Sequence, residues 1–186
     1  MTYLKTRYIS IITLCLVATG CCKKKPVSPI DTLPPITGYG ANKFGCLVNA
    51  QAFLPKGIFF SGINMLECTY KNVDDTLYFN LRGSDLHQGN DVIVAMKGIS
   101  LKQDRSYILG SSDSSKCYGI YRDIGETQYT PSHQTRGLNC GLLTISHFDS
   151  LKLIVSGTFA FDAIDPINKD TIHVTDGRFD VQYTVY

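Results

Sequence analysis

Hydrophobic and polar residues alternate along two segments near the end of the chain, residues 153–163 and 178–185. A period of two residues is typical of strands that place one face on a core and the other in water. The residues predicted to face the core are Leu153, Val155, Phe159, Phe161, Phe179, Val181, Tyr183 and Val185. Residues 172–175 predict a third strand between these two, joined to the first by the turn-rich stretch 165–170. We therefore expect a C-terminal antiparallel meander.

Shorter strand-like segments, separated by turn residues, fill the chain from residue 44 to residue 148. They cover residues 44–48, 51–54, 65–70, 76–82, 91–101, 106–109, 117–122, 127–130 and 142–148. Asn49-Ala50 predicts a tight hairpin turn, and residues 71–75 predict a longer hairpin loop. No window carries a sustained helical period. About ten short strands in consecutive order predict a single all-β domain over residues 41–186, either an antiparallel β-sandwich or a barrel-like sheet.

The first 20 residues depart from this pattern and have the composition of a bacterial lipoprotein signal peptide. Lys5 and Arg7 form a basic start, residues 9–17 form an apolar stretch, and Ala18-Thr19-Gly20-Cys21 reads as a lipobox. We expect residues 1–20 to be removed and Cys21 to carry the lipid. Such a signal places the folded domain outside the cytoplasm.

Two alternatives fit the leader less well. A membrane-spanning helix needs about 20 apolar residues, whereas the run over residues 8–20 is shorter and is interrupted by hydroxyl side chains. Lipidation of Cys22 would place Cys21, rather than the small Gly20, before the modified residue. We therefore expect a lipid anchor at Cys21.

Residues 21–40 are predicted to be a lipidated, disordered tether rich in proline and lysine. Lys23, Lys24 and Lys25 follow the lipid site and suit anionic headgroups. The prolines beyond them favour an extended chain without a core. Residues 36–186 carry 13 Lys and Arg against 15 Asp and Glu, a net charge of −2, so nucleic acid is not an expected partner.

Four cysteines belong to the predicted domain, namely Cys46, Cys68, Cys117 and Cys140. In an oxidising compartment they are expected to form two disulfides, for which three connectivities exist. Pairing neighbours, Cys46 with Cys68 and Cys117 with Cys140, closes the shortest loops. Metal binding is not expected, because there is no C-x-x-C motif and no histidine at ligand spacing from these cysteines.

The sequence motifs of catalysis are missing as well. His87, His133, His147 and His173 are scattered, and the chain has no H-E-x-x-H motif and no G-x-S-x-G elbow. We therefore expect no catalytic residue, no metal and no cofactor. The alternative is a small periplasmic hydrolase, in which folding alone brings a serine, a histidine and a carboxylate together.

Three segments of the chain carry a family resemblance. Residues 44–49 (FGCLVN), 156–161 (SGTFAF) and 175–181 (TDGRFDV), behind a leader ending in Gly-Cys, resemble an uncharacterised family of small Bacteroidota lipoproteins. The resemblance implies a cell-envelope location and a β-rich domain, without an assigned activity. Ala50 stands where the family has glycine. No Asp follows Cys21, which favours the outer membrane, and lysines replace the acidic export signal of such lipoproteins, which favours its periplasmic side.

Within this signature, Asp176, Arg178 and Asp180 are the candidate binding face. Arg178 and Asp180 share the polar side of the last predicted strand, and Asp176-Gly177 predicts a turn or bulge. An ordinary charged sheet face is the alternative. We expect a lipid-anchored envelope protein that is a non-catalytic binding or structural module for an envelope protein, a glycan or a small ligand.

Overall fold

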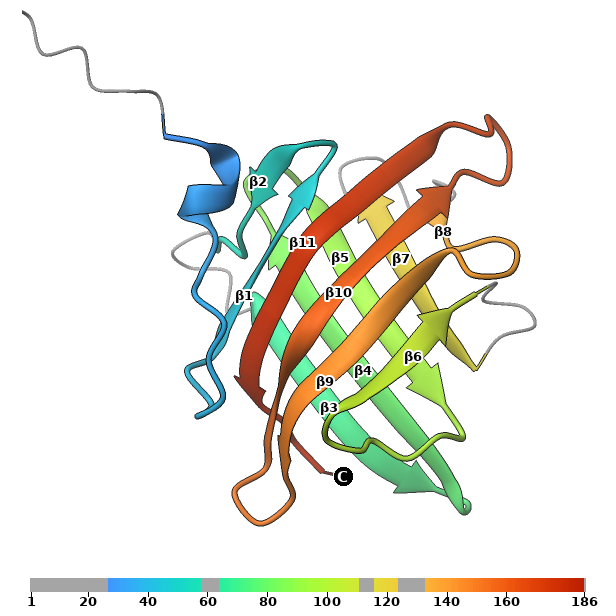
Figure 1. Cartoon of the computed structure of the whole chain (residues 1–186). Coiled ribbons are helices and arrows are strands. Elements are labelled where there is room, and N and C mark those ends of the chain that lie inside the picture. Colours follow the sequence, from blue (N-terminus) through green and yellow to red (C-terminus); the bar gives the residue numbers. More distant parts are fainter. Residues whose placement is uncertain (1–26, 58–63, 111–115, 124–132, 186) are drawn as a thin grey trace, which may run out of the picture.

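The structure, a computed structural model, describes residues 27–57, 64–110, 116–123 and 133–185 and shows an all-β domain (Figure 1). Within these ranges a short 3-10 turn, η1 (Pro29–Thr32), precedes the strands. The strands are β1 (Lys43–Val48), β2 (Gln51–Phe53), β3 (Leu66–Val73), β4 (Thr76–Asp85), β5 (Asn90–Lys97), β6 (Arg105–Leu109), β7 (Cys117–Asp123), β8 (His133–Gln134), β9 (Gly141–Asp149), β10 (Ile154–Ile164) and β11 (Thr171–Gln182). None of the described helices is long and apolar enough to cross a membrane. The predicted signal peptide, Cys21 and the predicted strand 127–130 lie outside the described residues.

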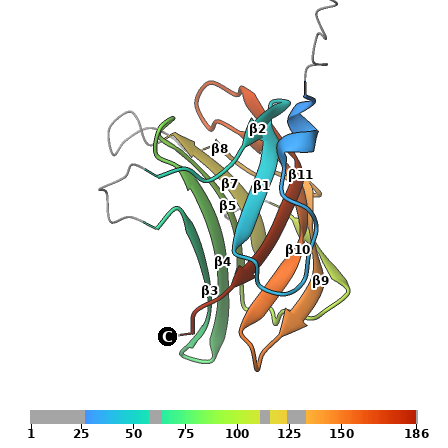
Figure 2. The ribbon, with the colours of Figure 1, turned by 90° about the vertical axis from the view of Figure 1, so that its left-hand side faces the viewer.

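One antiparallel sheet contains all the described strands, in the order β2-β1-β11-β10-β8-β7-β5-β4-β3. The sheet forks at β10, because β8 pairs with its end at Ile164 while β9 pairs with residues 154–161, and β6 extends β9. The sheet curls into a half-barrel with two facing walls (Figure 2). One wall holds β3, β4, β5 and β7, and the other holds β9, β10 and β11. The prediction of an all-β, barrel-like antiparallel domain is confirmed.

The end of the chain links the two walls of the half-barrel. Beyond β11, the Thr184 amide donates a hydrogen bond to the Cys68 carbonyl oxygen at 2.9 Å, and the Tyr70 amide donates to the Thr184 carbonyl oxygen at 2.9 Å. These bonds form a parallel bridge to the edge strand β3. Val185 was predicted to face the core, but it lies beyond this bridge and is exposed, so that prediction is wrong.

A bulge in β11 joins two segments that were predicted as separate strands. Phe159 pairs with Gly177 and Phe161 pairs with Val174, so residues 175 and 176 together oppose a single residue of β10. Asp176 has a φ of 53°. The extra residue shifts the side-chain alternation by one position. The inward side chains of β11 therefore belong to even-numbered residues before the bulge and to odd-numbered residues after it. The predicted bulge at Asp176-Gly177 is therefore present, and the strand continues through it.

Apolar side chains from both walls fill the interior. The ring centroids of Phe44 and Phe159 are 5.3 Å apart, and those of Phe159 and Phe179 are 6.3 Å apart. Leu81, Val94 and other aliphatic residues of the opposite wall belong to the same cluster. The core residues predicted from the alternation are buried or half-buried except Val185.

Two hairpins turn through pairs of residues with positive φ. Asn49 and Ala50 have φ values of 48° and 63°, and Asp74 and Asp75 have values of 48° and 60°. Two-residue loops with both φ values positive are type I′ turns, which match the twist of the flanking strands. The hairpin at Asn49-Ala50 is confirmed. The second loop is shorter than predicted, because Val73 already pairs with Thr76.

Candidate functional site

The three residues of the predicted binding face lie on β11 in different environments. Asp176 is exposed in the bulge of β11, and Arg178 is half-buried. Asp180 points away from the barrel interior, as the alternation predicts, yet only 1% of it is exposed. The expectation that it lies on a wet face is wrong, because residues 33–41, here called the strap, cross the outside of the sheet and cover it.

Asp180 fastens the strap to the sheet. Its carboxylate accepts hydrogen bonds from the Thr37 hydroxyl at 2.6 Å, from the Gly40 amide at 2.8 Å and from the Ala41 amide at 3.1 Å. From β10, the Ser156 hydroxyl donates to the same carboxylate at 2.7 Å. Burial acts to raise the pKa of Asp180, but these hydrogen bonds outweigh it and lower the pKa to about 2. Asp180 is therefore a charged structural anchor.

The strap has room to lie on β1 because position 45 is glycine. A Cβ atom at Gly45 would come within 2.7 Å of Pro34 Cδ. Leu33 is buried, and the Pro34 carbonyl oxygen accepts a hydrogen bond from Arg178 Nη1 at 3.3 Å. Residues 33–40 were predicted to belong to a disordered tether, but in the structure they pack against the domain.

A groove of about 300 Å³ lies beside the strap on the outer face of β9, β10 and β11. Small side chains such as Thr144, Thr158 and Ala160 form its floor, and larger ones stand around it. The larger lining residues are Ile36, Leu142 and Arg178. Ile36 is 59% exposed and Leu142 is 45% exposed. Two members of the predicted binding face, Asp176 and Arg178, thus lie at a surface groove.

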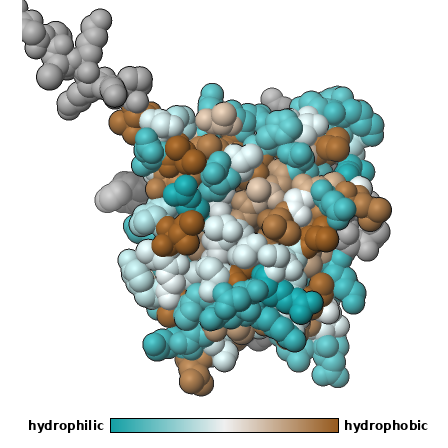
Figure 3. Space-filling view, in the orientation of Figure 1, coloured by the Kyte–Doolittle hydropathy of each residue, from teal (hydrophilic) through white to brown (hydrophobic). Residues whose placement is uncertain are grey.

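An apolar row leads across the sheet to this groove. Ile108 on β6, which is 58% exposed, pairs with Leu142 on β9, and Leu142 pairs with Ala160 on β10. Figure 3 shows hydrophobic patches among hydrophilic ones on this side of the molecule. These residues were not predicted from the sequence. Ile108-Leu109 and Leu142-Leu143 are consecutive pairs of large aliphatic residues, and in a strand one member of such a pair must point outward.

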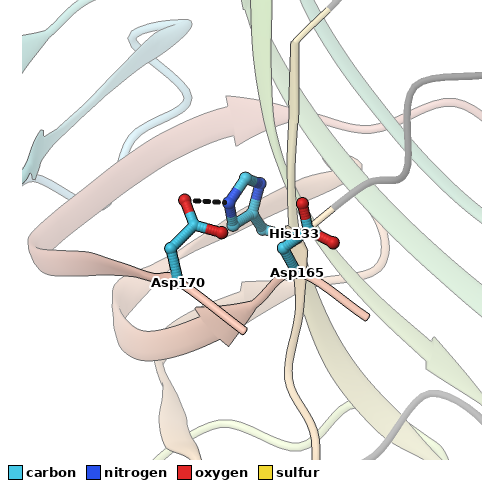
Figure 4. Close-up of side chains that lie close together, drawn as sticks. All are labelled: His133, Asp165 and Asp170. Carbon is cyan, nitrogen blue, oxygen red and sulfur yellow. Dashed lines mark hydrogen bonds and ion pairs between the residues drawn. The ribbon is translucent and has the colours of Figure 1, made fainter. Parts of the chain in front are cut away.

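His133, Asp165 and Asp170 form the one group of potential metal ligands found among the described residues, with ligand atoms within 4.8 Å of one another. The His133 imidazole lies between the two carboxylates, and its Nε2 is 3.2 Å from Asp170 Oδ2 (Figure 4). Asp165 Oδ1 also accepts a hydrogen bond from the Ile167 amide at 2.6 Å, which holds the pKa of Asp165 below its ordinary value. Asp165 therefore caps the loop between β10 and β11, and we assign no metal to the group.

The other histidines predicted as scattered are found on different elements. His87 Nε2 is 2.8 Å from the Gly57 carbonyl oxygen, and His173 Nδ1 is 2.7 Å from Asp162 Oδ1. His147 lies against the strap at Gly38. In the described ranges these rings contact a carbonyl oxygen, a carboxylate or the strap, and the hydrolase alternative gains no supporting geometry from them.

The four domain cysteines are free thiols in the structure. The predicted disulfides, Cys46 with Cys68 and Cys117 with Cys140, are not formed. Cys46 lies on β1, which pairs with β2 and β11, whereas Cys68 lies on β3, which pairs with β4. The Cys140 thiol instead donates to the Arg136 carbonyl oxygen at 3.0 Å. Burial raises the pKa of the Cys46, Cys68 and Cys117 thiols.

Comparisons with protein-family models, with curated proteins and with solved structures give no match to this chain. The resemblance to small Bacteroidota lipoproteins therefore stays a prediction. A fold alone does not define a function, so the surfaces of the domain are the remaining guide to it.

Proposed function

We propose that this protein is a lipid-anchored cell-envelope module that acts without catalysis and binds a partner protein through the groove between the strap and β9–β11. The anchor is the lipid on Cys21, and the domain faces the periplasm from the outer membrane. The leader and the lysine-rich segment after it support this location.

The exposed aliphatic row carries the proposal. Ile108, Leu142 and Ile36 expose apolar surface in one region that ends at the guanidinium of Arg178. Contiguous apolar patches rimmed by polar groups mark protein interaction sites. Aliphatic side chains suit a protein partner better than a sugar, since sugars are commonly bound on flat aromatic faces and the one aromatic ring at this groove, Phe159, is buried.

A photo-crosslinking amino acid at position 142 tests the groove in the anchored, full-length protein in its own envelope. We expect one defined protein adduct, identified by mass spectrometry, and its loss when Ile108→Asp is added. The same crosslinker at position 151 is the matched control, because Leu151 is 95% exposed but lies in the hairpin tip between β9 and β10. Equal adducts from both positions would contradict the proposal.

The anchor is tested separately by membrane fractionation. Cys21→Ser removes the thiol that accepts the lipid, so the protein should leave the membrane fraction or stay unprocessed. Cys22→Ser should behave as wild type. Lipid labelling of the Cys21→Ser protein at the wild-type level would exclude this site.

A further inference from the structure

The opposite wall of the half-barrel is formed by β3, β4, β5 and β7 (Figure 2). A second surface hollow lies on its outer face. Its volume is about 540 Å³. The side chains that matter most for its chemistry are Lys71, Tyr78, Arg82, Lys97, Tyr118 and Arg122. This hollow shares no lining residue with the groove beside the strap. Binding in the hollow therefore does not require binding in the groove.

Strand register explains why the surface is hollow here. Tyr78 pairs with Lys97 in one row across the sheet, and Arg82 pairs with Ile93 in another. The row between them has Ala95 on β5, whose side chain is a single methyl group. Tyr118 pairs with Ala95 and stands at the end of this row. A small floor between taller side chains therefore forms a trough across the strands.

Charge is concentrated on this face. Lys71, Arg82, Lys97 and Arg122 line the hollow. Glu67 pairs with Arg82 and Asp91 pairs with Arg122, so two cations are in excess. The domain as a whole has the opposite balance, because residues 36–186 carry a net charge of −2. A local excess of cations on an acidic domain produces a directed positive potential that favours anionic ligands.

Carboxylates of the protein hold both arginines in place. Arg82 contacts Glu67 through Nη2 at 2.9 Å, while its Nε is buried and has no acceptor among the described residues. Asp91, which is buried, binds Arg122 through Nε at 3.2 Å and through Nη2. Asp91 thereby positions the Arg122 guanidinium, whose Nη1 is outside this pair.

We infer that this face binds an acidic polysaccharide, with uronic-acid carboxylates on the cations and sugar rings in the trough. The strands β4 and β5 are hydrogen-bonded on both sides, so a ligand here meets side chains and not a free strand edge. Thr69 and Asn80 line the hollow and supply polar groups for sugar hydroxyls. Tyr118 brings an aromatic ring to the hollow for sugar C–H groups, whereas Lys97 Nζ already lies over the Tyr78 ring, 5.7 Å from its centroid. Guanidinium groups bind carboxylates through paired hydrogen bonds.

Titration calorimetry with polygalacturonate at low salt tests this inference on the purified full-length protein. Arg82→Gln with Lys97→Gln should weaken binding at least tenfold. Lys102→Gln with Lys152→Gln removes the same charge from exposed sites elsewhere and should leave affinity within about twofold. Tyr118→Ala should also weaken binding, because it removes a ring without changing charge. Thermal unfolding confirms that each variant is folded.

Three further probes distinguish a polysaccharide from other anionic partners. Neutral dextran should not bind, and polyglutamate and vesicles rich in phosphatidylglycerol should bind at least tenfold more weakly than polygalacturonate. Raising the salt concentration should reduce polygalacturonate affinity, because exposed charges are screened. Equal affinity for polyglutamate or for the vesicles would overturn the inference. Wild-type affinity in the Arg82→Gln, Lys97→Gln protein would overturn it as well.

Discussion

Thr37 and Asp180 are joined by a hydrogen bond of 2.6 Å although 143 positions separate them in the chain. The bond ties the entry segment of the domain to its last strand. The same carboxylate also binds Ser156 and the main chain of the strap, so one buried side chain holds three segments together.

Asp180→Asn should lower the free energy of unfolding by about 1.5–3 kcal/mol, the range for hydrogen bonds to a charged group. The N–H groups of the new side-chain amide would face the Thr37 hydroxyl and the strap amides, which are themselves donors. Urea unfolding measures the change. Asp176→Asn is the matched control on the same strand, and because Asp176 is exposed its effect should stay within about 0.5 kcal/mol. Similar stabilities of the two variants would show that Asp180 does not anchor the strap.

The same anchor predicts a dependence of stability on acid. The pKa of Asp180 is about 2 in the folded protein, below its ordinary value of 3.8. Because the pKa is lower in the folded protein, the ionised carboxylate stabilises the fold at pH values above the ordinary pKa. This contribution, about 2 kcal/mol, disappears as the pH falls from about 4 to about 2. The stability difference between wild type and Asp180→Asn should therefore shrink over that window. A difference that stays constant from pH 6 to pH 2 would contradict the lowered pKa.

Ala50→Gly should stabilise the protein by about 0.5–1 kcal/mol. Ala50 has a φ of 63°, a conformation that glycine adopts without steric cost. The control is Ala52→Gly in the adjacent strand β2, where added backbone freedom should be destabilising. Thermal unfolding should thus move the two melting temperatures in opposite directions. Destabilisation by both changes would mean that Ala50 is not strained.

The thiols should react in a fixed order. Cys46, Cys68 and Cys117 are buried and have raised pKa values, so iodoacetamide should modify them slowly in the folded protein. Cys140 is only partly buried and should be modified first. Peptide mass spectrometry before and after unfolding in urea measures the four rates. A disulfide-linked peptide, or equal rates in the folded state, would contradict the structure.

The strands and most of the core could be predicted because they depend on local alternation. Phe159 and Phe179 were assigned to the interior from the spacing of their neighbours alone, and both are buried. The one-residue shift of the side-chain alternation within β11 could not be predicted in the same way. It follows from the bulge at Asp176, which the sequence indicates through Asp-Gly but whose effect on the register appears only with the partner strands.

The candidate sites depend on contacts between distant segments, and local patterns do not report these. Asp180 was assigned to the correct face but the wrong environment, since its cover comes from residues 37–41. The cysteine pairs were inferred from loop length, but loop length does not show that Cys46 and Cys68 lie on strands that are not paired in the sheet. The cationic hollow needs four strands in register before Lys71 and Arg122 share one surface.

The strap also determines how mechanical tension enters the domain. A pull applied upstream of residue 27 reaches Asp180 through the strap, and Asp180 lies on β11, which is paired with both β1 and β10. Tension is therefore delivered to an interior strand and shared by two ladders as shear, instead of peeling an edge strand away bond by bond. Because β11 continues to the bridge between Thr184 and β3, the same strand carries that tension to the far wall. A domain pulled from its N-terminal side would in this way keep its fold under tension.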